Sequence, residues 1–354
     1  MARFRKAQYW IFVPGDAGSV AAVPHEVLVK RAHLLSVLGR WEKAESDLLK
    51  CRTPGGIPGQ AEFSSQVLLE LAGIRINQGR LGEARELIGD YESGGLDSAP
   101  ERKMNITNLK GKLAFYQGDL TAAKCGFRRV MELAESSGQQ IHKAQAGLNL
   151  GNISVMEGDM EAAESFYRKA LTISEELQDV SGIGMALGGL GILAAERGEH
   201  QRALECFRRD LDIGLRLGQA QTVAQTHGNI GQLLADMGRF HEAMDSYQEQ
   251  LEITRRIGDA PGTFNALYCL ASCASELGKP AEASDCLRRA ADHGIEWSMA
   301  TEAAKALLDL AGIQVEAGET EAARATVAEL LALGEEVRDR SLIERALSLK
   351  GRIG

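Results

Sequence analysis

Hydrophobic and polar residues alternate along this chain with the period of an α-helix, and the pattern breaks at regular intervals. Between Gln139 and Val155, small or apolar residues recur every three or four positions, and the dipeptide Gly158-Asp159 then interrupts them. A second run with the same spacing follows and ends near Ile173. Each run has the length and the one-sided apolar face of an amphipathic helix. The pattern therefore predicts a helical hairpin that turns at the glycine, the residue that most readily adopts a left-handed conformation.

This hairpin pattern recurs eight times. A glycine marks each turn, and an alanine follows it five residues later in every case. The glycines are 40 residues apart six times and 39 residues apart once. Such a period is typical of a solenoid, whose units bury their apolar faces against their neighbours. The turn glycines are Gly39, Gly79, Gly118, Gly158, Gly198, Gly238, Gly278 and Gly318, and the alanines are Ala44, Ala84, Ala123, Ala163, Ala203, Ala243, Ala283 and Ala323.

Two further positions keep their character in all eight repeats. The residue seven places before the turn glycine is always small: Ala32, Ala72, Gly111, Gly151, Gly191, Gly231, Ala271 or Ala311. The residue nine places after it is always large and apolar: Leu48, Ile88, Phe127, Tyr167, Phe207, Tyr247, Leu287 or Val327. We expect the small residue to let two helices approach closely and the large one to fill the gap against the following repeat. Leucine in place of Gly151 or Ala163 would then cost about 1–3 kcal/mol through overpacking.

Bulk composition narrows the classes of function. The chain is 44% hydrophobic and 25% charged, as in ordinary folded proteins, and its net charge of −9 argues against nucleic-acid binding. No stretch approaches the ~20 apolar residues that span a bilayer. Six scattered cysteines fit no small disulfide framework, which favours free thiols in a reducing compartment and a cytoplasmic location. The basic and then apolar N-terminus has the order of a secretion signal, but Gln8 interrupts a short run, which favours an arm over the first repeat.

The landmarks resemble those of the tetratricopeptide repeat (TPR) family. The family pattern of Leu-Gly, then Ala and an aromatic residue four places later, is met by Leu150-Gly151 with Ala163 and Tyr167. The two following repeats meet it with Leu190-Gly191, Ala203 and Phe207, and with Ile230-Gly231, Ala243 and Tyr247. The resemblance covers roughly residues 25–335 and is closest to the 40-residue variety, which includes Pins/LGN-type polarity scaffolds and many bacterial regulatory proteins. The usual period is about 34 residues, and the family's proline near the end of the second helix is missing here.

The resemblance implies an all-α fold, a right-handed α-solenoid of about eight TPR hairpins followed by a C-terminal helix. We expect an N-terminal arm over residues 1–24 and repeats one and two over 25–100. Repeats three to eight would occupy 101–337, and 338–354 would be either a capping helix or the start of a truncated ninth repeat. The links around 52–60 and 92–100 are rich in Gly, Pro and Ser, which predicts a looser N-terminal third.

No catalytic constellation emerges from the sequence. His241 begins a zinc-like helix motif but Asp245 stands where the second histidine belongs, and Gly182 and Gly184 lack the third glycine of a dinucleotide loop. Three cysteines, Cys269, Cys273 and Cys286, could face one metal, but no fourth ligand has a fixed spacing from them, so buried structural thiols are favoured. We therefore predict no enzyme activity, no metal and no cofactor.

The resemblance also implies that the first helix of each hairpin lines a concave groove. Polar residues at groove positions are Asn105, Asn108, Lys112, Gln145, Asn149, Asn152, Gln225, Asn229, Gln232 and Asn265. Because amide side chains both donate and accept hydrogen bonds, a ladder of them suits the main chain of an extended peptide. The segment from Asn149 to Asn152 is similar to peptide-gripping segments of Pins/LGN-type repeats. Lys112 alone is similar to the lysines with which other grooves of the family clamp a C-terminal carboxylate. The alternative is that these amides only keep an exposed helix soluble.

Two other features carry predictions. Gly188 and Gly189 fall between the amide-rich repeats at inner positions, where missing side chains would leave room for a bulky ligand residue. Basic pairs on the second helices should form a solvated convex face, and the alternative is a site for an acidic partner: Arg128-Arg129, Arg168-Lys169, Arg208-Arg209 and Arg288-Arg289. Three of these arginines have an acidic residue four positions earlier, in the pairs Glu164 with Arg168, Glu205 with Arg209 and Asp285 with Arg289.

The sequence thus predicts a non-catalytic scaffold or adaptor that binds an extended peptide segment of a partner protein. The alternative function is a ligand-sensing regulatory arm of a larger signalling or transcription-regulating protein. Homo-oligomerisation through exposed apolar residues of the end hairpins stays open.

Overall fold

The computed structural model describes residues 24–37, 40–51, 61–94, 99–336 and 339–353. The turn glycine Gly39, the predicted link at 52–60 and residues 95–98 of the link predicted at 92–100 lie outside these ranges, as does the predicted N-terminal arm except for Pro24. Residues 92 and 93 belong to the preceding helix and Pro100 begins the next one, so the second link is shorter than predicted. Within them, every regular element is an α-helix. The predicted all-α repeat fold is therefore confirmed.

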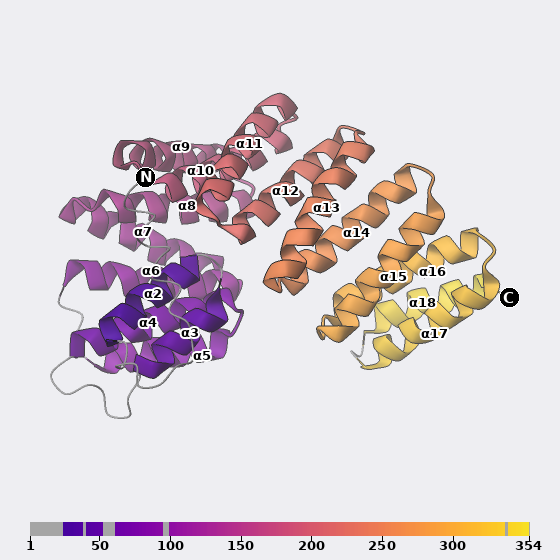
Figure 1. The fold of residues 1–354 in the computed structure, drawn as a ribbon, viewed down its shortest axis with the longest axis horizontal. Helices are drawn as coiled ribbons and strands as arrows, with labels where there is room; N and C mark the ends of the chain where they lie inside the picture. The colour runs from indigo at the N-terminus through magenta and orange to yellow at the C-terminus, as the bar shows by residue number, and fades with distance from the viewer. Residues whose placement is uncertain (1–23, 38–39, 52–60, 95–98, 337–338, 354) are drawn as a thin grey trace, which may run out of the picture. The chain divides into compact units, whose positions relative to one another are not determined.

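The helices pair in sequence order as hairpins with the predicted period (Figure 1). The first four hairpins are α2 (His25–Val37) with α3 (Trp41–Cys51), α4 (Ala61–Asn77) with α5 (Leu81–Ser93), α6 (Pro100–Tyr116) with α7 (Leu120–Ser137), and α8 (Gln140–Met156) with α9 (Met160–Leu177). The next four are α10 (Val180–Glu196) with α11 (His200–Leu217), α12 (Ala220–Asp236) with α13 (Phe240–Ile257), α14 (Ala260–Glu276) with α15 (Pro280–Glu296), and α16 (Ala300–Glu316) with α17 (Thr320–Glu336). A further helix, α18 (Arg340–Ile353), follows the eighth hairpin.

The turns inside the hairpins form at the predicted glycines. All seven described turn glycines have φ between 68° and 80°, the left-handed region that favours glycine. At Gly158 the backbone N–H donates to the carbonyl of Val155 at 3.0 Å, and the next N–H, of Asp159, reaches back to Ser154 at 2.8 Å. The carboxylate of Asp159 then accepts a hydrogen bond from the N–H of Ala162 and caps the second helix. Glycine and acid together therefore end one helix and start the next.

A second left-handed position, which the sequence analysis missed, recurs between hairpins. It is occupied by Gly138, Gln178, Gly218, Gly258 and Ser298, again 40 residues apart, with φ between 54° and 74°. Two of the five are not glycine, so the repeat does not stand out in the sequence. Gln178 and Ser298 hold a conformation that costs an L-residue about 1 kcal/mol or more.

We name the small and large positions of each hairpin the core pair, and in hairpins three to six the two residues lie in contact. A Cβ added to Gly151 would lie 2.5 Å from the ring of Tyr167, so the ring covers the glycine of its own hairpin. Large residues also reach the next hairpin as predicted, since Phe127 packs with Leu150 and Ile153. All eight core pairs are buried. Glycine faces an aromatic residue in hairpins three to six, whereas alanine faces an aliphatic residue in hairpins one, two, seven and eight.

The chain divides into two compact units, Met1–Ala186 and Leu187–Gly354, and the division falls inside α10. In both units, consecutive helices pack on each other, and first helices of neighbouring hairpins also touch, as α4 with α6 in one unit and α12 with α14 in the other. The first helices therefore share a layer within each unit. The predicted limits at residues 24, 100 and 337 lie at or beside undescribed ranges and remain predictions.

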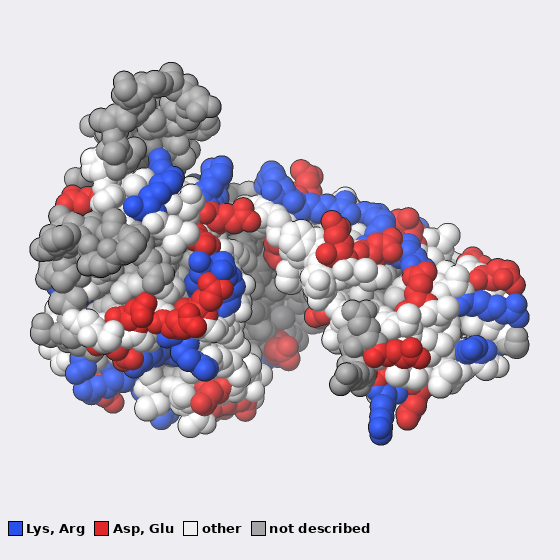
Figure 2. Space-filling view, turned by 90° about the horizontal axis from the view of Figure 1, so that it is seen from below, with Lys and Arg blue, Asp and Glu red and all other residues white. Residues whose placement is uncertain are grey.

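Two of the three predicted ion pairs form on the second helices. Figure 2 shows basic and acidic side chains close together on one face of the molecule. Arg168 pairs with Glu164 at 2.7 Å, and Arg289 pairs with Asp285 at 3.1 Å. The third predicted pair, Glu205 with Arg209, has not formed, although four residues separate its members as in the others. Of the helices described, none is long and apolar enough to cross a membrane.

Candidate functional site

Polar side chains gather on one face of α6 and α8, in the first of the two units. They stand thirteen, nine or ten, six and two residues before the turn glycine, a spacing that keeps them on one side of a helix. We name this surface the first-helix face. In hairpins three and four it consists of Asn105, Asn108, Lys112, Tyr116, Gln145, Asn149, Asn152 and Met156.

Hydrogen bonds between the two helices join the predicted amides into a ladder. The Nδ2 of Asn149 donates to the Oδ1 of Asn108 at 3.3 Å, and the Nε2 of His142 lies 3.1 Å from the Oδ1 of Asn105. These contacts span 41 and 37 residues of sequence, close to the repeat period, so neighbouring first helices lie side by side. Gln145 is exposed on the same face and extends the ladder toward solvent.

A buried tyrosine orients the amide nearest the turn. The hydroxyl of Tyr167 donates to the Oδ1 of Asn152 at 2.6 Å, which leaves the Nδ2 of Asn152 as the group that faces outward. Burial raises the pKa of Tyr167 to about 12, so its hydroxyl keeps its proton, and continues to donate, at pH values where an exposed tyrosine is ionised. The second helix therefore sets which way an exposed amide on the first helix points.

Lys112 lies in a small cavity beside these amides. The cavity has a volume of about 170 Å³ and is lined by Asn77, Lys112, Phe115, Tyr116, Phe127, Asn149 and Asn152. No carboxylate pairs with Lys112 anywhere in the described ranges. Burial lowers its pKa because the charged ammonium loses hydration. Lys112 and Asn152 thus offer hydrogen-bond donors, and no acidic side chain lines the cavity with them.

This arrangement suits an incoming acceptor. A carboxylate or a peptide carbonyl at the cavity would meet the ammonium of Lys112 and the amides of Asn149 and Asn152. Exposed Tyr116 and Met156 border the same face and can contact apolar side chains of a ligand.

The four predicted residues of the second unit do not form a matching site. In hairpin six, the Nε2 of Gln232 donates to Asp236 at 2.9 Å and its Oε1 lies 3.4 Å from the hydroxyl of Tyr247, so both ends of this amide are engaged. Gln225 and Asn265 are exposed, and Asn229 is half-buried. The sequence suggests that the amides of hairpins four and six are equivalent, but Gln232 is bonded at both ends whereas the Nδ2 of Asn152 has no hydrogen-bond partner among the described residues.

Three residues that the sequence analysis passed over belong to the first-unit site. Asn77 lies two residues before its turn glycine, the position that Tyr116 occupies one hairpin later, so the repeat register could have found it. Tyr116 lines the same cavity. Tyr167 was assigned to the core only, and its hydroxyl reaches Asn152 from beneath.

The space beside Gly188 is occupied from within the protein rather than left open for a ligand. A Cβ at Gly188 would lie 3.5 Å from the Oδ2 of Asp210, which accepts a hydrogen bond from Thr226 at 2.7 Å. Burial raises the pKa of Asp210. The expected cavity for a bulky ligand residue is therefore wrong at Gly188, and neighbouring Gly189 is buried.

The thiols are free, as predicted, but they are not all buried. Cys51, Cys273 and Cys286 are buried, Cys206 and Cys269 are half-buried, and Cys125 is exposed. In the part of the chain with described positions, no three His, Cys, Asp or Glu side chains converge as a metal site would require.

The fold and these repeat landmarks define a TPR-type helical repeat protein. The MalT-like TPR region family matches residues 105–304, more than half of the chain, and the chain belongs to this family. The family of anaphase-promoting complex subunit 5 matches residues 274–353. No curated protein sequence matches the chain.

Solved structures share the fold at low sequence identity. A Rap protein complexed with competence and sporulation factor is 16% identical, with 93% of this chain and 96% of that one covered and a TM-score of 0.63. A STAND protein (signal transduction ATPase with numerous domains) with a tetratricopeptide repeat sensor, from Pyrococcus horikoshii, is 15% identical; 89% of this chain covers 49% of it at a TM-score of 0.69. Aspartyl phosphate phosphatase F from Bacillus subtilis is 13% identical, with 93% and 98% covered and a TM-score of 0.55.

Proposed function

We propose that this chain is a non-catalytic binding protein that holds an extended segment of a partner protein on the first-helix face of α6 and α8. A carboxylate of the segment, from an acidic side chain or a chain terminus, lies beside Lys112. The observation that carries the proposal is a lysine without an acidic partner in a cavity shared with Asn149 and Asn152.

The energetics favour such a ligand. A desolvated ammonium without a counter-charge is costly, and the protein recovers that cost when a carboxylate arrives. Asn152 meets the same carboxylate through the Nδ2 that Tyr167 leaves free. Farther along the ladder, Gln145 and Asn105 offer donors and acceptors that match a peptide main chain. An extended segment can therefore bond to Lys112 and Asn152 through its carboxylate and to Gln145 and Asn105 through its main chain at the same time.

The similar structures support the proposal. One of them is a Rap protein with a bound factor, competence and sporulation factor. A helical repeat of this fold is thus known in complex with a recognition ligand, and we carry that behaviour to this chain.

A display experiment tests the proposed function. A library of random peptides, with both free and blocked C-termini, is selected on the native chain and on a Lys112→Gln/Asn152→Ala variant. We expect peptides with a carboxylate to be enriched on the native chain only. The matched control is Lys169→Gln, which removes a lysine charge from the exposed side of α9, and it should retain the same peptides. Equal enrichment on the native chain and the double variant would reject the site.

A second candidate function rests on one observation. The STAND protein that shares the fold carries its repeats as a sensor, and this chain covers 49% of that protein. The repeats could then serve as the sensing arm of a larger protein. Sequencing the gene on both sides of these 354 codons decides: an ATPase or DNA-binding domain in the same reading frame supports the sensor, and stop codons directly at both ends oppose it.

A further inference from the structure

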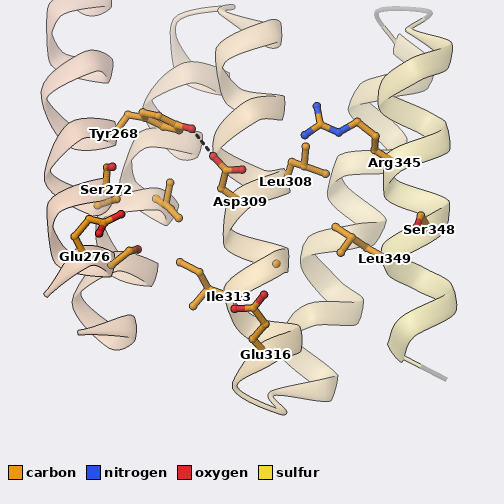
Figure 3. Close-up of a pocket in the computed structure, with 14 residues that line it drawn as sticks. Tyr268, Ser272, Glu276, Leu308, Asp309, Ile313, Glu316, Arg345, Ser348 and Leu349 are labelled. Carbon is orange, nitrogen blue, oxygen red and sulfur yellow. Dashed lines mark hydrogen bonds between the residues drawn. The ribbon is translucent and has the colours of Figure 1, made fainter. Parts of the chain in front are cut away.

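The second unit contains a hollow between the first helices of its last hairpins. The hollow has a volume of about 540 Å³ and opens between α14, α16 and α18 (Figure 3). Its floor is apolar, with Leu308, Ile313 and Leu349, and its walls carry Tyr268, Asp309, Glu276, Glu316 and Arg345. We name it the C-terminal hollow.

The hollow exists because side chains shrink at one repeat position. Six residues before the turn glycine, hairpins three, four and six carry Lys112, Asn152 and Gln232, whereas the adjacent hairpins seven and eight carry Ser272 and Gly312. Hairpin two also has a glycine there, Gly73, beside the side chain of Leu109. A Cβ at Gly312 would meet no atom within 4 Å. The repeat position that carries the long side chain of Asn152 in hairpin four therefore leaves an open space in hairpins seven and eight.

Carboxylates surround this space without cationic partners. Glu276 and Glu316 stand two residues before their turn glycines, and both face the same end of the hollow in Figure 3. Neither forms an ion pair with any described residue. On the outer helices of the same unit some acids are paired, as Glu282 is with Lys279 at 3.1 Å and Glu321 with Arg324 at 3.0 Å. Glu276 and Glu316 have no such partner among the described residues and are open to a cationic group of a ligand.

The other end of the hollow has a different charge. Arg345 of α18 faces this end together with Asp309 and Tyr268 (Figure 3), and no carboxylate of a described residue lies within ion-pair distance of it. The hydroxyl of Tyr268 donates to Asp309, and Lys305 stacks on the Tyr268 ring at 4.1 Å from its centroid. Asp309 is therefore already engaged, and the guanidinium of Arg345 is available to a ligand.

The two ends are separated by a measurable length of helix. Asp309, at the Arg345 end, and Glu316 are seven residues apart on α16, which corresponds to about 10 Å along the axis. An extended polypeptide covers that length in about three residues.

We infer that the C-terminal hollow binds an extended segment of a partner protein that carries a lysine or arginine and, about three residues away, a carboxylate. The cationic group lies between Glu276 and Glu316, its methylene stem covers Ile313 and Leu349, and the carboxylate meets Arg345. The carboxylate belongs to an acidic side chain or to the C-terminus of the segment. This site is separate from the proposed function, because it uses no residue of α6 or α8.

The test starts from a chain in which the first site is disabled. Random peptides are selected on the full chain carrying Lys112→Gln and Asn152→Ala, and binding of the recovered peptides is measured by fluorescence anisotropy. Adding Glu276→Gln and Glu316→Gln should weaken binding about three- to tenfold, as expected for exposed charge pairs. Glu252→Gln with Glu296→Gln removes the same charge elsewhere in the unit and should change nothing. Peptides with amidated C-termini distinguish an acidic side chain from a terminal carboxylate.

A charge reversal tests the other end. With Arg345→Glu, peptides in which the acidic residue is replaced by lysine should bind better than the parent peptides, which reverses the preference of the native residue. The inference is overturned if no peptide is enriched, if enriched peptides lack a basic residue, or if the Glu276/Glu316 and Arg345 changes leave binding unaltered. Failure here leaves the α6–α8 site untouched, since that site was removed beforehand.

Discussion

Hairpins four and seven have the same backbone plan but opposite surfaces. In hairpin four the core pair is Gly151 with Tyr167, and the hydroxyl of Tyr167 passes under the first helix to hold Asn152. In hairpin seven the core pair is Ala271 with Leu287, both of which line the C-terminal hollow. In hairpin four the hydroxyl of Tyr167 therefore holds an exposed amide in place, whereas in hairpin seven the shorter Leu287 leaves a space beside the first helix.

The difference shows how a solenoid can vary its binding surface from the inside. A glycine is needed wherever the second helix presents an aromatic ring, because any Cβ would enter the ring. Alanine suffices opposite leucine, isoleucine or valine. The choice of core pair then decides whether the first-helix face above it can be held by a buried hydroxyl. Surface chemistry and core packing are coupled within one hairpin.

The largest effect should come from Gly151→Ala. Alanine normally stabilises a helix interior by about 1 kcal/mol relative to glycine. Here its Cβ would lie 2.5 Å from the Tyr167 ring, so we expect a loss of about 2 kcal/mol from overpacking. Chemical denaturation followed by circular dichroism measures the change. A gain in stability would show that the ring moves freely and that glycine is not required.

The reverse change in hairpin seven provides the matched comparison. Ala271→Gly meets no ring and should cost about 1 kcal/mol through helix propensity alone. Combining Gly151→Ala with Tyr167→Leu recreates the hairpin-seven pair inside hairpin four. The double variant should be more stable than the sum of the single changes predicts, by about 1 kcal/mol or more. Strict additivity would mean that the two residues do not form a pair.

Tyr167→Phe isolates the hydroxyl from the ring. Loss of the hydrogen bond to Asn152 should cost about 1 kcal/mol. Because the folded pKa of Tyr167 is raised to about 12 from 10.0, its contribution to stability is complete below pH 10 and is lost as the pH rises through 12. The native chain should therefore lose stability over this range more steeply than the variant does. Parallel pH profiles would contradict the buried hydroxyl.

The smallest effect on stability should come from the links that follow hairpins four and seven. Each link contains one non-glycine residue in the left-handed conformation. Gln178 and Ser298 have φ of 54° and 56°, where other links have glycine. Gln178→Gly and Ser298→Gly should each raise the free energy of unfolding by about 0.5–1 kcal/mol, since glycine relieves the strain but loses more entropy on folding. Gly258→Ala at the same position should lower it. A loss in both glycine variants would indicate that these side chains make contacts worth more than the strain.

The sequence predicted the hairpins, their turns and the small and large core positions because each depends on one residue type recurring at a fixed interval. It placed the large residue against the following repeat only and did not predict that the ring also covers the glycine of its own hairpin. It missed the second left-handed position, since Gln178 and Ser298 hide that repeat. It treated the amides of hairpins four and six as equivalent, yet Gln232 is engaged by Asp236 and Asn152 is not. Such differences depend on side-chain orientation. The C-terminal hollow escaped notice because it consists of missing side chains, and Ser272 and Gly312 carry no pattern of their own.

The most direct test is the pH dependence of peptide binding at Lys112. A carboxylate peptide selected on the native chain is titrated by fluorescence anisotropy from neutral pH to 10.5, with Lys112→Gln for comparison. Burial lowers the pKa of Lys112, so its ammonium loses its charge at a lower pH than that of an exposed lysine. We predict that native affinity exceeds that of the variant at neutral pH and falls toward that of the variant as the pH rises. Equal affinities at neutral pH, or curves that stay parallel to pH 10.5, would contradict a carboxylate site at Lys112.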